Sequence, residues 1–482
     1  MKSIEPNLFV FFGGTGDLAR RKLMPSLARL QSRGLLGEGS YVLALSRKPE
    51  FDDESFRAFA HEEMMKFGVE AAVSEGFLDR LYFQSIGDST EEDFQSLKAR
   101  IEEIEERHSI PQNRAYYLAL PPSVFEHAIH GLGRAGLNHS EGWTRVVVEK
   151  PFGHDLESAQ KLNRVIHEHF NESQVYRIDH YLGKDTVQNF MVFRFANPIF
   201  ERLWNRDTIE SIEISVGESI GTGGRAEYYD KSGALRDMIQ NHLTQLFSLI
   251  AMEVPAIYEP EAVRNEKIKV LRSTLAPGPD DVVYGQYAGG SVDGEKTKGY
   301  LHEEGVAPDS KTETFVALKL RIDNWRWQGV PFYLRTGKRM PMKTSRVVIK
   351  FKGAPVSLFE SMGNVDLDRN VLVLKLQPDE GFDLYFNVKK PGSPFDITRM
   401  PLRFRYKEEF AEIPEAYETL LLDVLDGDQT LFVHAEEVEA SWELYSELIT
   451  SPPRPKPYFG GSWGPESADE LGVDEAQRLF RS

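Results

Sequence analysis

The sequence predicts an α/β domain followed by a larger α+β domain, and three observations lead to this prediction. The chain has 482 residues, more than the roughly 250 to 300 at which a single hydrophobic core stops growing. In the first part, short apolar runs alternate with helix-patterned segments. From about residue 180 onward, strand-like runs follow one another with little helix between them. We therefore expect two domains, residues 1–179 and 180–482.

The first domain is expected to contain a parallel sheet. Six apolar runs would form its strands, and most segments between them space their apolar residues as one face of a helix does. This alternation is typical of a doubly wound parallel sheet, which binds ligands beyond the carboxyl ends of its strands. The six runs are residues 8–12, 41–46, 81–86, 115–120, 145–150 and 175–179.

The first of these strands is followed by the glycine-rich sequence GGTGDLARRKL. Glycines at this place let the backbone approach a pyrophosphate, whose charge would be held by the amides at the start of the next helix. The spacing Gly13-x-x-Gly16-x-x-Ala19 differs from the usual G-x-G-x-x-G. A plain strand-to-helix turn is therefore the alternative.

Cations stand at the ends of two further strands. Arg47 and Lys48 follow the second strand, where an acid usually binds the ribose of NAD. They suit a 2′-phosphate and so favour NADP, with a solvated basic strand end as the alternative. Lys150 ends the fifth strand just before Pro151, which biases it to extended geometry. It is placed to bridge nicotinamide and substrate, unless it simply reaches water.

The second domain is expected to build a mainly antiparallel sheet packed on helices. The helix-like run KDTVQNFMVFRFAN precedes an alternating strand, IESIEISVGESIG, and a long helical segment follows at 233–252. Little helix separates the later strand-like runs, which are TFVALKLRID, PFYLRTGK, RVVIKFKG, NVLVLKLQ and DLYFNVKK.

The helical segment 233–252 carries His242 on an otherwise apolar stripe, together with Asp237 and Asn241. A histidine in such a place is often a satisfied core residue, which is the alternative to a chemical role. A neutral imidazole held by a carboxylate can take the hydroxyl proton of an alcohol as hydride leaves. On an α-helix Asp237 would lie about 140° around the axis from His242, so the two are not expected to face each other.

The stretch VYRIDHYLGK, residues 175–184, collects ionisable groups at the end of the sixth strand. Its aspartate, Asp179, is a candidate partner for His242. His180 and Lys184 are spaced i, i+4 and would share a face if the segment were helical. Together they would supply donors for the dianion of a sugar phosphate.

Composition narrows the classes of partner. Lys and Arg number 57 against 75 Asp and Glu, a formal net charge of -18, which argues against general affinity for nucleic acid or anionic membrane. Because the chain has no cysteine, disulfides, thiolate nucleophiles and cysteine-bound metal clusters are excluded. The apolar run at 8–12 is too short for a signal core or a membrane span, and we expect a cytoplasmic protein.

Motifs along nearly the whole chain together resemble those of the glucose-6-phosphate dehydrogenase family. The stretches RIDHYLGK and RDMIQNHL are highly specific, whereas EKP also occurs in other sugar oxidoreductases. In chain order the motifs are GGTGDLARRKLMPS, YLALPPSVF, EKPFG, RIDHYLGK, FRFAN with LWNRD, RDMIQNHLTQ, YLRTGK and GSWGP.

The resemblance implies a role for each matching residue. His242 would be the general base and Asp179 would orient it. Substrate binding would involve Lys150, His180, Tyr181, Lys184, Glu218, Asp237, Lys338 and Lys343. Cofactor binding would involve Gly13, Gly14, Thr15, Gly16, Asp17, Leu18, Arg47, Asp88 and Lys150.

The resemblance also implies a reaction and a fold. The family oxidises β-D-glucose 6-phosphate at C1 to the 6-phospho-1,5-lactone and reduces NADP, with NAD as a secondary cofactor and no metal. The first domain would then be a Rossmann-like NADP-binding domain. The second would bind substrate and form a homodimer or homotetramer through its large sheet.

Two other interpretations remain open at this point. A different NAD(P)-dependent sugar oxidoreductase acting on unphosphorylated sugar would not need His180 and Lys184 as a pair. A non-catalytic NADP-sensing or scaffold protein would bind cofactor without turnover. Comparing turnover of glucose 6-phosphate, galactose 6-phosphate and free glucose separates these interpretations from the resemblance.

Overall fold

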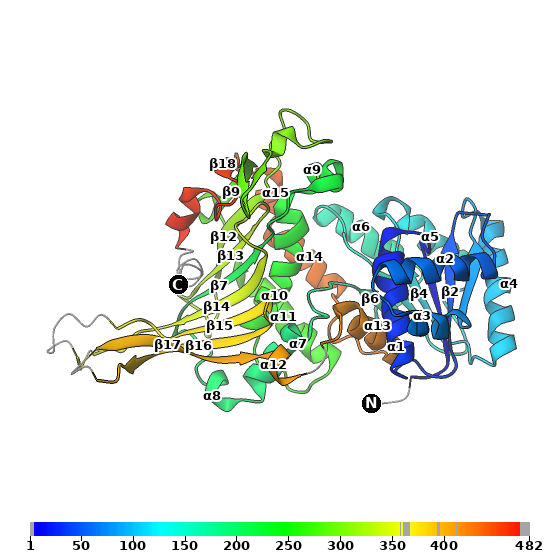
Figure 1. Cartoon of the computed structure of the whole chain (residues 1–482), viewed down its shortest axis with the longest axis horizontal. Helices are drawn as coiled ribbons and strands as arrows, with labels where there is room; N and C mark the ends of the chain where they lie inside the picture. The colour runs from blue at the N-terminus through cyan, green and yellow to red at the C-terminus, as the bar shows by residue number, and fades with distance from the viewer. Residues whose placement is uncertain (1–3, 357, 360–366, 393–395, 411–412, 473–482) are drawn as a thin grey trace. The chain divides into compact units, whose positions relative to one another are not determined.

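The computed structural model describes residues 4–356, 358–359, 367–392, 396–410 and 413–472. The chain divides into two compact units (Figure 1). The first contains Met1–Lys184 and two later segments, Ile257–Arg264 and Pro414–Glu439. The second contains Asp185–Ala256, Asn265–Ile413 and Ala440–Ser482. The domain limits expected from the sequence remain a prediction.

The first unit is built on a six-stranded parallel sheet of order β3-β2-β1-β4-β5-β6. Each predicted apolar run contributes one strand, so the doubly wound parallel sheet is confirmed. The strands are β1 (Asn7–Phe12), β2 (Ser40–Ser46), β3 (Leu81–Ser85), β4 (Arg114–Leu118), β5 (Thr144–Val148) and β6 (Val175–Arg177).

Helices of the first unit form two packed groups. One group packs on the alternate side chains of the strands that include Phe9 and Phe11, because successive residues of a strand point to opposite faces. It contains α1 (Met24–Ser32), α2 (Asp53–Lys66), α3 (Ala71–Leu78) and α13 (Ala416–Asp426). The other group contains α4 (Glu91–His108), α5 (Phe125–Arg134) and α6 (Leu156–His167), and the short turns are η1 (Ala19–Leu23), η2 (Pro122–Val124) and η3 (Glu172–Gln174).

A partly buried ion pair anchors the late segment 414–439 to this sheet. Arg177 of β6 is fully buried and its Nη1 lies 2.6 Å from Oε1 of Glu172. The same carboxylate accepts the backbone N–H of Ala435 at 3.0 Å. Burial alone would raise the pKa of Glu172, but Arg177 and its neighbours lower it to about 2. This arginine of the RIDHYLGK motif is therefore a structural residue.

The second unit contains a ten-stranded mixed sheet of order β17-β16-β15-β14-β7-β13-β12-β9-β18, with β8 paired to β12. Among the strand pairs of the described residues only β7–β13 and β9–β18 are parallel, so the expected mainly antiparallel sheet is confirmed. The strands are β7 (Ile209–Gly217), β8 (Thr274–Leu275), β9 (Val282–Ala288), β12 (Phe315–Ile322), β13 (Pro331–Gly337), β14 (Thr344–Phe351), β15 (Val371–Gln377), β16 (Gly381–Lys389), β17 (Ile397–Arg405) and β18 (Lys456–Phe459). A separate hairpin joins β10 (Gly290–Val292) to β11 (Glu295–Thr297).

The two edge strands of this sheet, β17 and β18, were not predicted from the sequence. β17 contains Pro401 and β18 contains Pro457. Proline lacks the N–H that a central strand needs, and it is therefore found mainly in edge strands and bulges. The prolines fit the edge positions, but they also weaken the strand signal in the sequence.

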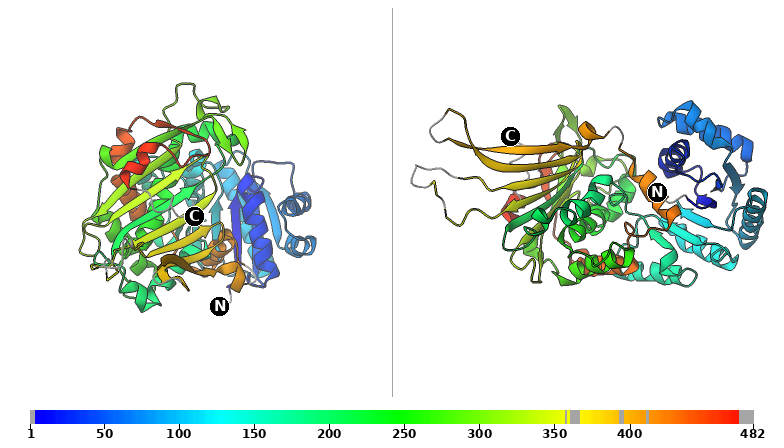
Figure 2. Two further views of the ribbon diagram at one scale, coloured as in Figure 1. Left: turned by 60° about the vertical axis from the view of Figure 1, so that its left-hand side comes forward. Right: turned by 90° about the horizontal axis from the view of Figure 1, so that it is seen from below.

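Helices cover one face of the large sheet (Figure 2). η5 packs on β7, β12 and β13, and it also contacts α10, which packs on α7. The helices and short turns of this unit are α7 (Asp185–Phe195), α8 (Pro198–Glu201), η4 (Gly223–Arg225), α9 (Ala226–Ala234), η5 (Leu235–Leu243), α10 (Thr244–Ala251), η6 (Pro279–Asp281), η7 (Tyr300–His302), α12 (Tyr406–Glu409), α15 (Ser446–Thr450) and η9 (Glu466–Leu471). Two further helices, α11 (Pro260–Ser273) and α14 (Ala435–Leu444), have residues in both units.

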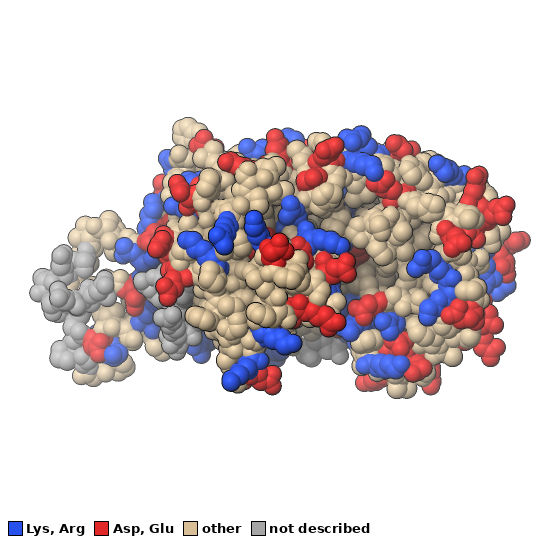
Figure 3. Space-filling view, turned by 90° about the horizontal axis from the view of Figure 1, so that it is seen from above, with Lys and Arg blue, Asp and Glu red and all other residues tan. Residues whose placement is uncertain are grey.

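Basic and acidic side chains are interspersed over the face shown in Figure 3. Among the described residues on that face, no broad surface of one sign is visible. Within the part of the chain that the structure describes, no helix has the length and apolarity needed to cross a membrane.

Candidate active site

The glycine-rich turn after β1 is shaped for close approach of a ligand to the backbone. Gly13 has φ +80°, and a Cβ there would lie 2.3 Å from the carbonyl oxygen of Ala119, so only glycine fits. The amide of Gly16 donates to the Gly13 carbonyl at 2.8 Å, and the helix begins at Asp17. A tight turn that leads into a helix N-terminus suits a pyrophosphate, so these residues fit a dinucleotide.

Residues at the next two strand ends lie at the same edge of the sheet. β2 and β3 run parallel to β1, so Arg47 and Asp88 follow strands that end where the glycine-rich turn begins. Both side chains are exposed. Lys48 lies over the ring of Phe51 at 5.8 Å. Among the described residues no ion pair involves Arg47, so its guanidinium is available to an anion.

Lys150 follows β5 beside a partly buried carboxyl group, Glu149, that was not among the residues predicted from the sequence. Oε1 of Glu149 accepts the hydroxyl of Tyr117 at 2.5 Å and that of Tyr417 at 3.1 Å. Burial raises the pKa of Glu149 against the opposing effect of the two hydroxyls. Tyr417 lies in α13, far along the sequence, so no local pattern could reveal this contact. The hydrogen bonds of Glu149 fix the end of β5, and therefore the backbone next to Lys150.

The segment from Asp179 to Lys184 forms consecutive turns, so the condition of a helical segment, under which His180 and Lys184 would share a helix face, is not met. The amide of Leu182 donates to the Asp179 carbonyl at 3.0 Å and that of Lys184 to the Tyr181 carbonyl at 3.3 Å. His180 and Lys184 nevertheless come together around one ring. The His180 and Tyr181 ring centroids lie 5.1 Å apart, and Nζ of Lys184 lies 4.0 Å from the Tyr181 centroid.

In the second unit, strand pairing gathers three predicted substrate residues at one sheet edge. β7 and β13 are parallel neighbours with Gly217 opposite Gly337, so Glu218 and Lys338 leave the sheet side by side. Nζ of Lys338 lies 2.6 Å from Oε2 of Glu218. Lys343 stands just before β14, whose first residue also pairs with Gly217.

The segment with Asp237 and His242 is a π-helix, η5, and not the α-helix expected from the sequence. In a π-helix the backbone bonds run from i to i+5, so residues five apart lie roughly one turn apart on the same face. The expectation that Asp237 and His242 point about 140° apart was therefore wrong. The π-helix is anchored by Thr244, whose hydroxyl lies 2.9 Å from that of Tyr445.

Tyr229 and Glu313 lie near these residues, although neither was predicted from the sequence as a site residue. Burial raises the pKa of Tyr229, and the charges of Asp237, Glu313 and Glu218 raise it further. Nζ of Lys338 lies 4.8 Å from the Tyr229 ring centroid. Lys338 therefore contacts both the Glu218 carboxylate and the Tyr229 ring.

Glu313 supports the start of the π-helix. Its Oε1 accepts the backbone N–H of Leu235 at 2.9 Å, an amide that has no acceptor within the helix. Burial raises the pKa of Glu313 to about 7, while the Leu235 N–H lowers it. The protonation state of this carboxyl group is thus coupled to the helix that carries His242.

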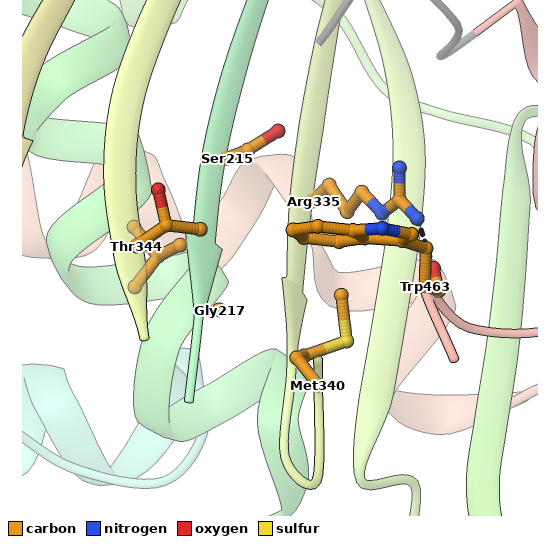
Figure 4. A pocket seen from close by; sticks show the side chains of 7 residues that line it. Ser215, Gly217, Arg335, Met340, Thr344 and Trp463 are labelled. Carbon is orange, nitrogen blue, oxygen red and sulfur yellow. Dashed lines mark hydrogen bonds between the residues drawn. The ribbon is translucent and has the colours of Figure 1, made fainter. Parts of the chain in front are cut away.

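The GSWGP motif packs near the same sheet edge. A small pocket is lined by Gly217, Arg335, Met340 and Trp463, and the indole of Trp463 lies between Arg335 and Met340 (Figure 4). Nη2 of Arg335 donates to the Trp463 carbonyl oxygen. Because Gly217 immediately precedes Glu218, this packing supports the strand end that carries the Glu218–Lys338 pair.

Comparison with known proteins shows the family. Residues 10–189 match the model of the glucose-6-phosphate dehydrogenase NAD binding domain, and residues 191–480 match that of the glucose-6-phosphate dehydrogenase C-terminal domain. The chain belongs to the glucose-6-phosphate dehydrogenase family. It is therefore an oxidoreductase with a domain that binds a nicotinamide dinucleotide.

Individual members of the family match along nearly their whole length. The glucose-6-phosphate 1-dehydrogenases of Aggregatibacter actinomycetemcomitans and Bacillus subtilis are 44% and 43% identical to this chain. The matches cover 98% and 97% of this chain, and 96% and 97% of the relatives.

Solved structures of the family have the same fold. A glucose-6-phosphate dehydrogenase in complex with glucose 6-phosphate has a TM-score of 0.90 at 36% identity, covering 98% of each chain. The enzyme from Mycobacterium avium has a TM-score of 0.85 at 34% identity, covering 97% of each chain. 

The predicted residues of the family site are divided between the two units. The cofactor residues, Lys150 and the 179–184 turn belong to the first unit, whereas Glu218, Asp237, His242, Lys338 and Lys343 belong to the second. The role of each residue, including the pairing of Asp179 with His242, stays a prediction.

We predict that Glu313→Gln changes the pH dependence of stability. A raised carboxyl pKa means that the folded state keeps its proton while the unfolded chain loses it. The Glu313 contribution to the free energy of unfolding should therefore fall as the pH rises from about 4.5 to about 7. Because the amide cannot ionise, the variant should gain up to about 3 kcal/mol relative to the parent across this window.

Urea denaturation of both proteins at several pH values measures this difference. Glu295→Gln, at an exposed position of the β10–β11 hairpin, is the matched control and should leave the profile unchanged. Parallel pH profiles for the parent and Glu313→Gln would show that Glu313 ionises normally.

Proposed function

We propose that the chain oxidises β-D-glucose 6-phosphate at C1 to 6-phospho-D-glucono-1,5-lactone with hydride transfer to NADP, the first step of the oxidative pentose phosphate pathway. The observation that carries this proposal is the match to both domains of the family over residues 10–189 and 191–480. It is supported by the relatives named glucose-6-phosphate 1-dehydrogenase and by the solved relative in complex with glucose 6-phosphate.

In the proposed mechanism His242 is the general base. Its imidazole removes the proton of the C1 hydroxyl as the hydride leaves C1, and Asp179 orients the ring and stabilises its charged form. Bound nicotinamide would supply the hydride acceptor. Lys150 would contact both cofactor and sugar from the end of β5, on backbone held by the Glu149 contacts. No metal is required in this scheme.

The 179–184 turn would bind the substrate phosphate. His180 and Lys184 both lie against the Tyr181 ring, so one small surface offers an imidazole, an ammonium group and a phenol to a dianion. The sugar hydroxyls would meet Glu218, Asp237, Lys338 and Lys343 of the second unit. A sugar oxidoreductase acting on an unphosphorylated substrate would not need His180 and Lys184 as a pair.

NADP is proposed as the preferred cofactor. The exposed Arg47 follows β2, next to the glycine-rich turn, where a 2′-phosphate would be bound. The remaining cofactor contacts would come from the 13–18 loop and from Asp88. NAD is proposed as a secondary cofactor, because the glycine-rich turn would bind the pyrophosphate, which NAD and NADP share.

Self-association through the large sheet is proposed as well, giving a homodimer or homotetramer. The second unit exposes apolar side chains on α8 and β17, including Ile199 at 69%, Leu402 at 58% and Met400 at 50%. A groove beside them is lined in part by Leu203, Leu384 and Phe386. Apolar surfaces of this kind are typical of protein interfaces. A cytoplasmic location remains a prediction from the sequence.

We predict that His242→Asn lowers kcat by about 10² to 10⁴, because the C1 hydroxyl loses its proton acceptor, with little change in substrate affinity. NADPH formation followed by absorbance gives kcat and KM, and calorimetry gives the substrate Kd. His302→Asn, at an exposed position of η7 in the same unit, is the matched control and should have nearly the same kcat and KM as the parent. Near-normal turnover by His242→Asn would remove His242 as the base.

We predict that Lys184→Ala raises KM for glucose 6-phosphate by at least about tenfold, since a hydrogen bond to a charged group contributes roughly 1.5 to 3 kcal/mol. The slow oxidation of free glucose should change little, because glucose has no phosphate to bind. Lys161→Ala, at an exposed position of α6, also removes one positive charge, and it is the control that should leave KM for glucose 6-phosphate unchanged. Equal losses with both sugars would contradict the phosphate assignment.

We predict that Arg47→Ala raises KM for NADP by about 10- to 100-fold while KM for NAD stays nearly constant. The physical reason is that only NADP carries the 2′-phosphate. Parallel assays with the two cofactors measure the change in the ratio of kcat/KM. Lys48→Ala should raise KM for NADP less than Arg47→Ala does. An equal loss of kcat/KM with NADP and with NAD in Arg47→Ala would contradict a role of Arg47 in binding the 2′-phosphate.

A further inference from the structure

A cluster of two histidines and a glutamate lies in the first unit, on elements separate from the glycine-rich turn and the strand ends. His130 stands on α5, and Glu168 and His169 directly follow α6. Nδ1 of His130 lies 2.9 Å from Nε2 of His169 and 4.0 Å from Oε2 of Glu168. One ligand atom from each of the three residues lies within 4.8 Å of the other two.

These separations are close to those of a tetrahedral metal site. Zinc binds imidazole nitrogen at about 2.0 to 2.1 Å and carboxylate oxygen at about 2.0 to 2.2 Å, so two of its ligand atoms stand roughly 3.4 Å apart. The histidine nitrogens would separate by about half an ångström, and the Glu168 oxygen would move in by a similar amount. Exposed rotamers of Glu168, whose side chain is 59% exposed, allow that movement.

The His169 ring is held in place by the fold. A Cβ on Gly133 would lie 2.1 Å from Nδ1 of His169, so the ring edge rests directly on the backbone of α5. The carbonyl oxygen of His169 accepts the side-chain amide of Asn138 at 2.6 Å. The second nitrogen, Nε2, is thereby directed at His130, and two of the three ligands are positioned before any ion binds.

We propose that His130, Glu168 and His169 form a binding site for a divalent cation of the zinc type. Two neutral imidazole nitrogens and one carboxylate oxygen are ligands that such ions favour. The proton now shared between the facing nitrogens moves to an outer ring nitrogen, so neither ring has to lose its N–H. Water completes the coordination, and the ion links α5 to the end of α6.

The surrounding charge adjusts the affinity of the site. The charges of Glu168 and Arg134 both act on the His169 ring. Arg134 lies one helical turn beyond His130 and repels a cation, while Glu168 attracts it. Removing the arginine charge should therefore tighten binding, and this gives a test in which affinity is gained instead of lost.

Calorimetric titration of the chelator-treated full-length protein with Zn²⁺ at neutral pH tests the site. We expect saturable binding of Zn²⁺ to the parent. Loss of an outer-shell partner lowers metal affinity roughly 10- to 100-fold, and His130→Asn, which removes a direct ligand, should lower the Zn²⁺ affinity by more than this. His127→Asn, about one turn earlier on α5, is the matched control and should bind like the parent. Arg134→Gln should bind a few-fold more tightly.

Thermal unfolding with and without Zn²⁺ gives a second measurement. The ion should raise the Tm of the parent and of His127→Asn but not that of His130→Asn, because only a native site stabilises the folded state. Equal affinity in the parent and His130→Asn would overturn the proposal. Absence of saturable binding would show that the two histidines only hydrogen-bond each other, which also overturns it.

Discussion

The pairing of parallel strands is the constraint on which the arrangement of this molecule depends. Parallel neighbours end at the same edge of a sheet, so residues far apart in sequence leave the sheet together. In the first unit this places Gly13, Arg47, Asp88 and Lys150 at one edge, beyond strands of a single sheet. In the second unit the one parallel pair at the centre of the sheet, β7–β13, has the same effect on Glu218 and Lys338.

Two of the three segments predicted to carry chemistry also contain π-helical turns. η1 follows the glycine-rich turn at the start of the first helix, and η5 contains Asp237 and His242. π-helical turns are rare in proteins as a whole, but those that occur are often found at functional sites. They change which side chains share a face of the helix. In η5 the change aligns Asp237 with His242. Contacts of the helix with the sheet and with Tyr445 maintain the irregular backbone.

Buried and partly buried carboxyl groups support the predicted site without belonging to it. Glu172, Glu149 and Glu313 each accept hydrogen bonds from residues distant in sequence, and each keeps one part of the fold in register. Their pKa values move in different directions because burial raises a carboxyl pKa and a buried arginine lowers it. Of these three groups Glu172 has a lowered pKa, because the charge and hydrogen bonds of Arg177 outweigh the effect of burial.

The sequence by itself determined the six parallel strands, the change to a mainly antiparallel sheet and the family, because apolar periodicity and short motifs are local properties. Only the tertiary structure decided which residues meet. The Glu218–Lys338 pair depends on strand register, the Tyr417–Glu149 bond on a helix more than two hundred residues away, and the shared face of Asp237 and His242 on a π-helix imposed by packing. Long-range contacts are set by the packing of whole elements, which no local pattern encodes.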